Sequence, residues 1–237
     1  KRLLQILRKL FVMPVDIRLS AHTSTLRFRP RAYSYIGSIP LIDLADRPLA
    51  DWEHVQKWLF DKVIGTLALI ALTPVMLLTA LAIKLDSRGP VLFIQPRGGY
   101  RQKPINVCKF RTMNVLETGP EVTQAQRNDP RVTRVGRFLR RTSLDELPQL
   151  LNVLRGELSL VGPRPHALAH DRRYGAIVEQ YANRHKIKPG ITGWAQVNGS
   201  RSQTEDPSLM RERVKYDLYY IDRSLAVIKR SEEHTSE

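Results

Sequence analysis

Residues 63–83 read VIGTLALIALTPVMLLTALAI and carry no charged side chain. Asp61 and Lys62 precede this stretch, and Lys84 and Asp86 follow it. A helix of about 20 apolar residues is long enough to cross the hydrocarbon core of a bilayer. A helix that is apolar on all sides also favours lipid over a one-sided protein core. The stretch therefore predicts a membrane helix, and a buried core helix of a soluble protein is the alternative.

Thr73 and Pro74 lie in the middle of this stretch and predict a strong kink. Proline lacks the backbone N–H and clashes with the preceding turn, and a threonine hydroxyl can satisfy the broken backbone locally. Basic residues flank both ends: Arg47, Lys57 and Lys62 on one side, and Lys84, Arg88, Arg97, Arg101 and Lys103 on the other. Because basic flanks stay in the cytoplasm, a re-entrant helical hairpin is favoured over a single span.

The composition bounds the class of protein. With 42% hydrophobic and 26% charged residues among 237, the chain is expected to fold. A net charge of +15 predicts attraction to nucleic acid, anionic lipid or phosphate-bearing substrates. The arginine-rich stretch lacks interleaved aromatic side chains for base stacking, which argues against nucleic acid as a partner. A single cysteine, Cys108, excludes an intrachain disulfide and a multi-cysteine metal site.

The rest of the chain predicts helices with a small β component. Residues 91–95 and 105–110 read as the two strands of a β-hairpin, and alternation near residues 15–19 and 36–44 suggests short strands before the membrane helix. Residues 132–141, VTRVGRFLRR, predict a basic amphipathic helix, which suits the lipid interface or an ordinary solvated face. Helical patterns also cover 169–184 and 208–222.

Asp145 and Glu146 are adjacent carboxylates that follow four arginines, and two interpretations remain open. Ser143-Leu-Asp-Glu has the spacing of a helix capping box, with acidic residues favoured by the helix dipole. Pro148 opposes that interpretation, since it would lie past the first turn of such a helix. If the helix starts nearer Pro148, the acidic pair lies on an irregular turn, where a carboxylate can act as a nucleophile or hold a hard cation.

Several cations are candidates for phosphate recognition. Residues 162–165, Gly-Pro-Arg-Pro, place one guanidinium on a stiff backbone, which lowers the entropy lost when it grips a phosphate. Lys109 and Arg111 offer two further cations at a strand end. A plain surface role is the alternative for each of these residues.

Four motifs carry a family resemblance. They are KFRTM at 109–113, NDPRVTRVGRFLRRTSLDELPQLLNVLRGELSLVGPRPH at 128–166, KPGITGWAQVNG at 188–199 and KYDLYYID at 215–222. In this order, behind an apolar helix, they resemble the bacterial polyprenyl-phosphate sugar-1-phosphate transferases. The resemblance covers residues 58–228 and includes several long motifs in the same order and spacing. It also identifies the chain as the catalytic part of a larger member.

The resemblance implies an α+β, mostly α, monotopic membrane protein with a re-entrant helix broken at Thr73-Pro74, interfacial amphipathic helices and a small β-hairpin. The implied reaction takes a UDP-sugar, with glucose or galactose expected, and undecaprenyl phosphate, with Mg²⁺ as cofactor. It would begin exopolysaccharide or O-antigen synthesis at the bacterial inner membrane, with the catalytic domain facing the cytoplasm. The resemblance also implies contact with membrane lipid, and a homodimer is possible.

The resemblance also implies roles for individual residues. Asp145 would attack the sugar-bearing phosphate, releasing UMP and leaving a phosphosugar on the enzyme, and Glu146 would be a Mg²⁺ ligand or an assisting base. The implied substrate-binding residues are Arg140, which would steady the phosphates, then Pro163, Arg164 and Pro165, which would shape the nucleotide site, and Lys109, Arg111 and Asp217 in support.

The predicted domains are residues 1–50 as the tail of a nucleotide-binding-like region and linker, 51–88 as the membrane helix, 89–228 as the catalytic domain, and 229–237 as a tail outside the family pattern. The opening residues, without an initial methionine, suggest the start of a fragment. Residues 200–206 depart from the WRGETD-like stretch expected in glucose-specific relatives. A membrane-anchored assembly factor that has lost catalysis is the alternative function.

Overall fold

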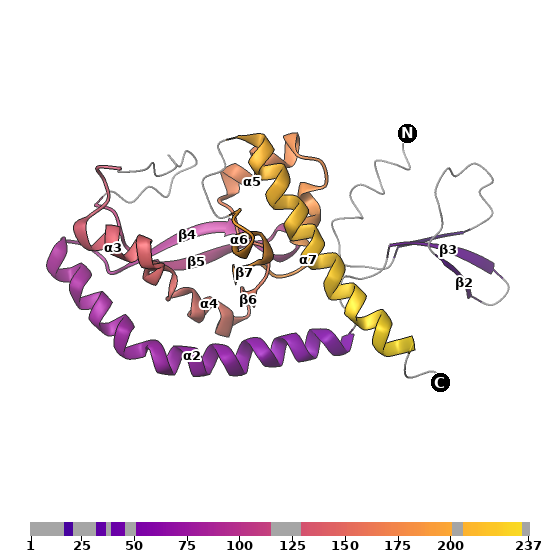
Figure 1. Cartoon of the computed structure of the whole chain (residues 1–237), viewed down its shortest axis with the longest axis horizontal. Coiled ribbons are helices and arrows are strands. Elements are labelled where there is room, and N and C mark those ends of the chain that lie inside the picture. The colour runs from indigo at the N-terminus through magenta and orange to yellow at the C-terminus, as the bar shows by residue number, and fades with distance from the viewer. Residues whose placement is uncertain are drawn as a thin grey trace.

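A computed structural model describes residues 17–20, 32–36, 39–45, 51–114, 129–200 and 206–233, with side-chain surroundings for 54–114, 129–200 and 206–223 (Figure 1). The described part is mostly helical with small sheets, which confirms the α+β, mostly α class. Strands β1 (Ile17–Ser20), β2 (Ala32–Ile36) and β3 (Ile39–Ala45) form an antiparallel sheet in the order β1-β3-β2. The short strands predicted before the membrane helix are therefore present, except that Val15 lies outside the described residues.

The apolar stretch lies within α2 (Asp51–Asp86), a single helix with Pro74 inside it. Among the described residues one helix, His54–Asp86, is long and apolar enough to cross a membrane. Figure 1 shows that α2 is bent along its length. The hydroxyl of Thr73 donates to the carbonyl of Leu69 at 2.7 Å, one turn back. The kink therefore takes the form of one continuous bent helix, and its placement in a membrane stays a prediction.

Both ends of α2 are attached to the same folded body. Near the start, Asp61 Oδ1 accepts a hydrogen bond from the backbone N–H of Leu160 at 3.0 Å. At the far end, Asp86 Oδ2 accepts from the backbone N–H of Val135 at 3.3 Å. Between these points α2 packs against the helices α3 (Arg134–Thr142) and α4 (Gln149–Arg155) and against strand β6 (Ser159–Val161).

The predicted β-hairpin is confirmed. Strand β4 (Leu92–Gly98) pairs antiparallel with β5 (Pro104–Phe110), and the 3-10 helix η1 (Tyr100–Gln102) connects them. Phe93 faces Lys109 across the ladder, and Arg97 faces Ile105. Because side chains alternate between the two faces of a strand, Gln95, Arg97 and Lys109 share one face of the hairpin.

Two helices joined by a tight turn follow the hairpin. Helix α3 (Arg134–Thr142) is capped by the Thr133 hydroxyl, and α4 (Gln149–Arg155) ends at Gly156, whose φ of 82° suits a glycine C-cap. The basic amphipathic helix predicted at 132–141 is therefore present as α3. Leu139 is buried and Phe138 is 59% exposed, and the placement of this helix at a lipid interface stays a prediction.

A buried cluster ties α2 to the turn between α3 and α4. Its centre is Ile83 of α2, Phe110 of β5 and Leu139 of α3. Leu144 and Leu147, on either side of the acidic pair, pack against it. The position of the acidic pair is thereby fixed relative to α2.

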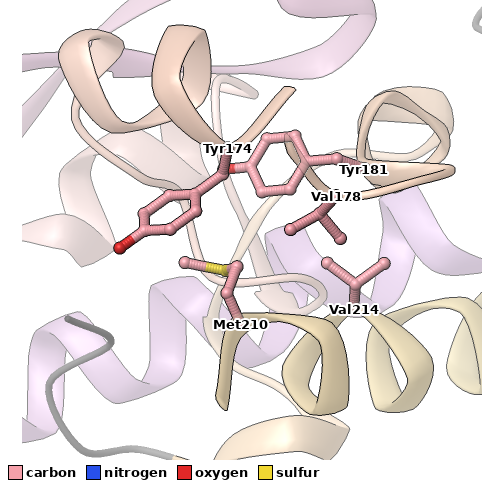
Figure 2. Close-up of a cluster of buried hydrophobic side chains, with 5 residues drawn as sticks. All are labelled: Tyr174, Val178, Tyr181, Met210 and Val214. Carbon is pink, nitrogen blue, oxygen red and sulfur yellow. The ribbon is translucent and has the colours of Figure 1, made fainter. Parts of the chain in front are cut away.

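The C-terminal half contains a second buried cluster. The elements of this half are β6 (Ser159–Val161), α5 (Leu168–Ile177), η3 (Tyr181–Lys186), β7 (Gly190–Thr192), α6 (Trp194–Val197) and α7 (Pro207–Glu233). Figure 2 shows the cluster, in which Tyr174, Val178 and Tyr181 face Met210 and Val214 of α7. The helix predicted over 169–184 is divided in two because Gln180 adopts φ 61° between α5 and η3. The helix predicted over 208–222 is confirmed as part of α7.

Candidate active site

The acidic pair lies on the turn between α3 and α4, and it does not form a capping box. Ser143 adopts a left-handed conformation with φ 62° and makes no side-chain cap hydrogen bond. Asp145 and Glu146 form the short 3-10 helix η2 (Leu144–Glu146), and α4 begins only after Pro148. The interpretation in which the helix starts at Pro148 is therefore correct, and both carboxylates lie on the irregular turn.

Glu146 is held by two cations. Its Oε1 accepts from Lys109 Nζ at 3.0 Å, and its Oε2 accepts from Arg164 Nη1 at 3.1 Å. A second guanidinium N–H of Arg164 also donates to Oε1. Burial by itself would raise the pKa of Glu146, but Lys109 and Arg164 hold it far below its usual value. Glu146 therefore stays ionised and fixed in place.

Asp145 has a different environment. Its carboxylate makes no hydrogen bond or ion pair with any residue in the described parts of the chain. Burial raises its pKa, and the negative charge of Glu146 adds to this, whereas Lys109, Arg140 and Arg164 oppose it. A poorly solvated carboxylate with free oxygens and cations around it is suited to attack an electrophile that carries negative charge.

Lys109 and Arg140 complete the cationic surroundings. Burial and the neighbouring Arg97 lower the pKa of Lys109 to about 8, despite the charge of Glu146. Arg140 donates from Nε to the hydroxyl of Thr112 at 2.8 Å. Burial lowers the pKa of Arg140 and the charge of Asp145 opposes this, so its guanidinium is electrostatically coupled to that carboxylate.

The Pro163-Arg164-Pro165 segment is fixed by three hydrogen bonds to its backbone carbonyls. The carbonyl of Pro163 accepts from the Gly190 N–H at 3.0 Å, that of Arg164 from Arg184 Nη2 at 2.8 Å, and that of Pro165 from Arg97 Nη1 at 2.6 Å. The donors come from β7, η3 and β4. Every carbonyl of the segment is occupied, so Arg164 extends toward Glu146 from a rigid base.

Glycine is required where this segment crosses β7. A Cβ on Gly190 would collide with the backbone of Gly162, and a Cβ on Gly162 would lie 2.5 Å from the carbonyl oxygen of Lys188. The segments at 162–165 and 188–190 can approach only because both positions lack a side chain. The two sequence motifs that contain these glycines thus meet behind Arg164.

A buried ion pair supports the same segment from below. Arg184 donates to Asp217 Oδ2 from Nε at 3.1 Å and from Nη2 at 2.7 Å, and both side chains are only 2% exposed. Burial alone would lower the pKa of Arg184, but Asp217 more than offsets this, so the guanidinium stays charged. Because Arg184 also holds the Arg164 carbonyl, Asp217 positions Arg164 through one intermediate residue.

An open cavity of about 430 Å³ lies next to Glu146. One wall is formed by Ala68 and Leu72 of α2. The remaining lining residues are Ser143, Glu146, Leu147, Leu150, Leu160, Ile191, Thr192, Gln196 and Val197. The cavity thus joins the apolar helix to the carboxylate turn.

A sequence profile described as bacterial sugar transferase matches residues 52–229. The chain belongs to this family. The UDP-glucose:undecaprenyl-phosphate glucose-1-phosphate transferase of Escherichia coli K12 is 54% identical over 78% of this chain and 40% of its own length. A protein of the same name from Caulobacter vibrioides is 47% identical over 95% of this chain and 80% of its own length. The family resemblance inferred from the motifs is confirmed.

Members of the family with other names also match. The UDP-N-acetylgalactosamine-undecaprenyl-phosphate N-acetylgalactosaminephosphotransferase of Aeromonas hydrophila is 41% identical over 68% of this chain and 38% of its own length. The chain therefore spans about two fifths of the length of several curated relatives. Relatives named for different donor sugars therefore both resemble this chain over two thirds of its length or more.

The structure brings most of the predicted site residues of this family member together. Asp145, Glu146, Lys109, Arg140 and Arg164 gather around the turn between α3 and α4. Pro163 and Pro165 lie on both sides of Arg164 and shape its backbone. The bent helix with Thr73 and Pro74 lies along the cavity wall that Leu72 contributes.

Arg111 and Asp217 are placed differently from their predicted substrate-binding roles. Arg111 is 3% exposed and donates to the backbone carbonyls of Ser87 and Arg88, where it fastens the end of α2 to β5. Asp217 is occupied by Arg184. Both side chains thus act on the scaffold of the site in this structure. Strand β5 ends at Phe110, so Arg111 lies past the strand and does not share the face of Lys109.

Arg97 belongs to the surroundings of the site although the sequence did not point to it. Arg97 is half-buried, holds the Pro165 carbonyl, and has its pKa lowered to about 10 by burial and by Arg164. The predicted hairpin ended its first strand at residue 95, which left Arg97 in the connecting loop, whereas β4 continues to Gly98. A strand extended to residue 98 would have placed Arg97 on the same face as Gln95 and Lys109.

The carboxylates of the acidic pair are the candidate ligands for the predicted magnesium ion. Among residues of the described ranges, no group of three or more His, Cys, Asp or Glu side chains is arranged to hold a metal. Magnesium is commonly bound through one or two carboxylates together with substrate phosphates. Among the residues that the structure describes, neither oxygen of Asp145 has a hydrogen-bond partner, and Oε2 of Glu146 accepts a single hydrogen bond. These donors fit a site that the protein shares with a phosphate ligand.

Proposed function

We propose that this protein transfers a hexose-1-phosphate from a UDP-sugar to undecaprenyl phosphate, with Asp145 as the nucleophile. The observation that carries the proposal is the inequality of the two adjacent carboxylates. Glu146 is fixed by Lys109 and Arg164, whereas Asp145 has no described partner and lies within the same positive field. Structural carboxylates are normally paired, so an unpaired one among cations indicates chemistry.

The reaction follows from this arrangement in two displacements. An oxygen of Asp145 attacks the phosphorus that carries the sugar, the new Oδ–P bond forms, and the bond from that phosphorus to the bridging oxygen breaks. UMP leaves with the bridging oxygen and its electrons. A phosphate oxygen of undecaprenyl phosphate then attacks the same phosphorus, and the Oδ–P bond breaks to regenerate Asp145.

Repulsion is the main obstacle to the first step, because a carboxylate must approach a pyrophosphate. Lys109, Arg140 and Arg164 lie close enough to shift the pKa of Asp145 and are placed to neutralise the phosphates. The rigid backbone around Arg164 lets that guanidinium act without first being ordered. Glu146 keeps Lys109 and Arg164 aligned when no substrate is bound.

Magnesium remains part of the proposal, held by Glu146 and by Asp145 or the substrate phosphates. When bound, it would supply positive charge that weakens the phosphorus–oxygen bond of the leaving UMP. Because Glu146 Oε1 already accepts from Lys109 and Arg164, the Oε2 atom is the more available ligand.

The lipid substrate accounts for the apolar helix and the cavity. The cavity beside Glu146 has an α2 wall and an otherwise largely apolar lining, which suits the first isoprene units of a polyprenyl phosphate. Leu77 of α2 is 66% exposed, as expected for a side chain that faces lipid. The attachment of both ends of α2 to one body supports the re-entrant topology over a span.

Glucose is the proposed sugar, because the relatives from Escherichia coli and Caulobacter vibrioides are named for UDP-glucose. Galactose is the second sugar to test. The proposed place is the inner membrane with the catalytic domain in the cytoplasm, where UDP-sugars are made. The product would start the assembly of an exopolysaccharide or O-antigen.

The experiment is to expose purified protein to UDP-glucose labelled in the sugar, without acceptor, and to look for label on the denatured chain. Wild type is expected to carry the label and to release UMP, and undecaprenyl phosphate is expected to discharge it. Asp145→Asn is expected to carry no label and to lose turnover by about 10⁴-fold or more.

Asp222→Asn is the matched control, since Asp222 is an exposed carboxylate on α7. That variant is expected to retain labelling and turnover. Label on Asp145→Asn would contradict the assignment of Asp145 as the nucleophile. An unlabelled wild-type chain in a preparation that is active in transfer would contradict it as well.

A further inference from the structure

A second cavity lies at the start of the apolar helix, away from the acidic turn. It has a volume of about 200 Å³ and is lined by side chains from α2, η1, β6, α7 and the segment before β7. His54, Lys57, Trp58 and Asp61 contribute the α2 wall. Leu72, which lines the cavity beside Glu146, is 14 residues further along α2 than Trp58, or about 20 Å at the rise of a helix. The two cavities are therefore separate.

Most of the polar groups in this cavity satisfy one another. Lys57 Nζ donates to Asp61 Oδ1 at 3.1 Å and to the Ser159 hydroxyl at 2.5 Å. The Ser159 hydroxyl and the Leu160 backbone N–H also lie within hydrogen-bond distance of Asp61 Oδ1, at 3.1 and 3.0 Å. The charge of Asp61 is therefore already matched by Lys57.

Lys188 is the exception. It lines the cavity, and its ammonium makes no hydrogen bond or ion pair with any residue in the described ranges. Burial lowers its pKa, Asp61 opposes this, and the charges of Lys62 and Lys57 lower it further. The cavity lining thus holds two lysines, Lys57 and Lys188, against one aspartate, Asp61, so it keeps excess positive charge with the Lys188 ammonium available.

The remaining walls are aromatic and apolar. Trp58, Tyr100 and Tyr220 line the cavity together with Val161 and Ile187. Trp58 is 53% exposed, at the end of α2 where the apolar segment begins. Tryptophan and tyrosine side chains prefer the level of the lipid head groups. A cavity with apolar walls and an available ammonium, at the depth of the head groups, has the chemistry to bind a lipid phosphate together with its glycerol and acyl chains.

We propose that this cavity binds the head group of an anionic membrane phospholipid, with Lys188 as the main contact to the phosphate. The glycerol and the upper acyl chain would lie against Trp58 and Tyr220. A bound phospholipid would hold the start of α2 at the head-group level. The proposal does not depend on the transfer reaction, because no residue of the acidic turn lines this cavity.

The experiment is to purify the protein from nanodiscs of equimolar phosphatidylcholine and phosphatidylglycerol and to count the retained phosphatidylglycerol by native mass spectrometry. Wild type and Lys188→Arg are expected to retain it, because both keep the cation. Lys188→Gln is expected to retain about fivefold less, the effect of losing one basic contact to lipid phosphate.

Lys215→Gln is the matched control, since Lys215 is an exposed lysine on α7 outside this cavity. Unchanged retention in that variant supports the proposal. Equal losses in Lys215→Gln and Lys188→Gln would overturn it, because they would reflect only the net charge of the chain. Equal retention in all variants would overturn it as well.

Two further measurements keep the result interpretable. Trp58→Ala leaves the charge unchanged and is expected to lower retention, so the cavity can be tested even where Lys188→Gln does not fold. Polyprenyl phosphate and inorganic phosphate serve as competitors with wild type. Displacement of phosphatidylglycerol by either one at equal concentration would overturn the phospholipid assignment, and retention against both supports it.

Discussion

Two arginine–carboxylate pairs of the same chemistry are joined by a single hydrogen bond. Glu146 pairs with Arg164 at the acidic turn, where their side chains are 11% and 20% exposed. Asp217 pairs with Arg184 beneath it, where both are 2% exposed. Arg184 joins the two pairs by donating to the Arg164 carbonyl at 2.8 Å.

The difference in burial separates their roles. The outer pair can exchange its contacts for substrate phosphates, because solvent and ligands reach it. The inner pair has no such access, and its two charges stabilise the fold only while both are present. The comparison teaches that motif residues of one ionic type divide into reacting and supporting groups by depth.

Removing the inner carboxylate tests the supporting role and has the largest expected effect. Asp217→Asn leaves the Arg184 guanidinium buried without its counter-ion, which costs about 3–5 kcal/mol of stability. The expected readout is a lower apparent melting temperature in detergent or nanodiscs. A variant that melts like wild type would contradict the supporting role.

Arg164→Ala tests the outer pair and is expected to lower activity with little effect on stability. Loss of a donor aimed at developing phosphate charge is expected to lower kcat by about 10²–10³-fold. The melting temperature should change little, since Arg164 is partly exposed and its backbone keeps all three carbonyl contacts. Similar melting losses in Arg164→Ala and Asp217→Asn would remove the distinction between the pairs.

The pH dependence of Lys109, the second cation on Glu146, gives the smallest effect. Lys109 has a pKa of about 8, so its ammonium is lost as the pH rises through that value. We expect kcat/KM to fall about 10-fold by one pH unit above it. Lys109→Arg should move this limb to higher pH, because a guanidinium holds its proton more tightly than an ammonium.

Unfolding would not mimic this result. The pKa of Lys109 in the folded chain lies below its ordinary value of 10.5, so between about pH 8 and 10.5 the unfolded chain binds more protons. The stability contributed by this group therefore rises with pH while activity falls. An alkaline limb that stays in place in Lys109→Arg would show that another group controls it.

Local patterns in the sequence predicted much of the fold. The apolar length of α2, its proline and the β-hairpin follow from short-range rules that the structure obeys. The helix predicted over 169–184 is broken at Gln180, which adopts a left-handed conformation. The sequence did not predict this break because a single left-handed residue other than glycine has no strong sequence signal.

The site was predictable only in part. The four motifs identified Asp145, Glu146 and Arg164 as site residues through the family resemblance. Spacing alone could not decide whether the acidic pair caps a helix or takes part in chemistry. The structure settles the capping question, because Ser143 is left-handed and Glu146 turns toward Lys109 and Arg164. The pairing of Asp217 with Arg184 joins residues 33 positions apart, which no local pattern contains.

Leu144 and Leu147, which flank the acidic pair, pack into the same cluster as Ile83 near the end of α2. No slack loop separates that helix from Asp145 on this path. If α2 enters a bilayer as proposed, a change of acyl-chain length that moves this helix along the membrane normal would carry Asp145 with it. Bilayer thickness would then control how well Asp145 meets a phosphate anchored in the same lipid.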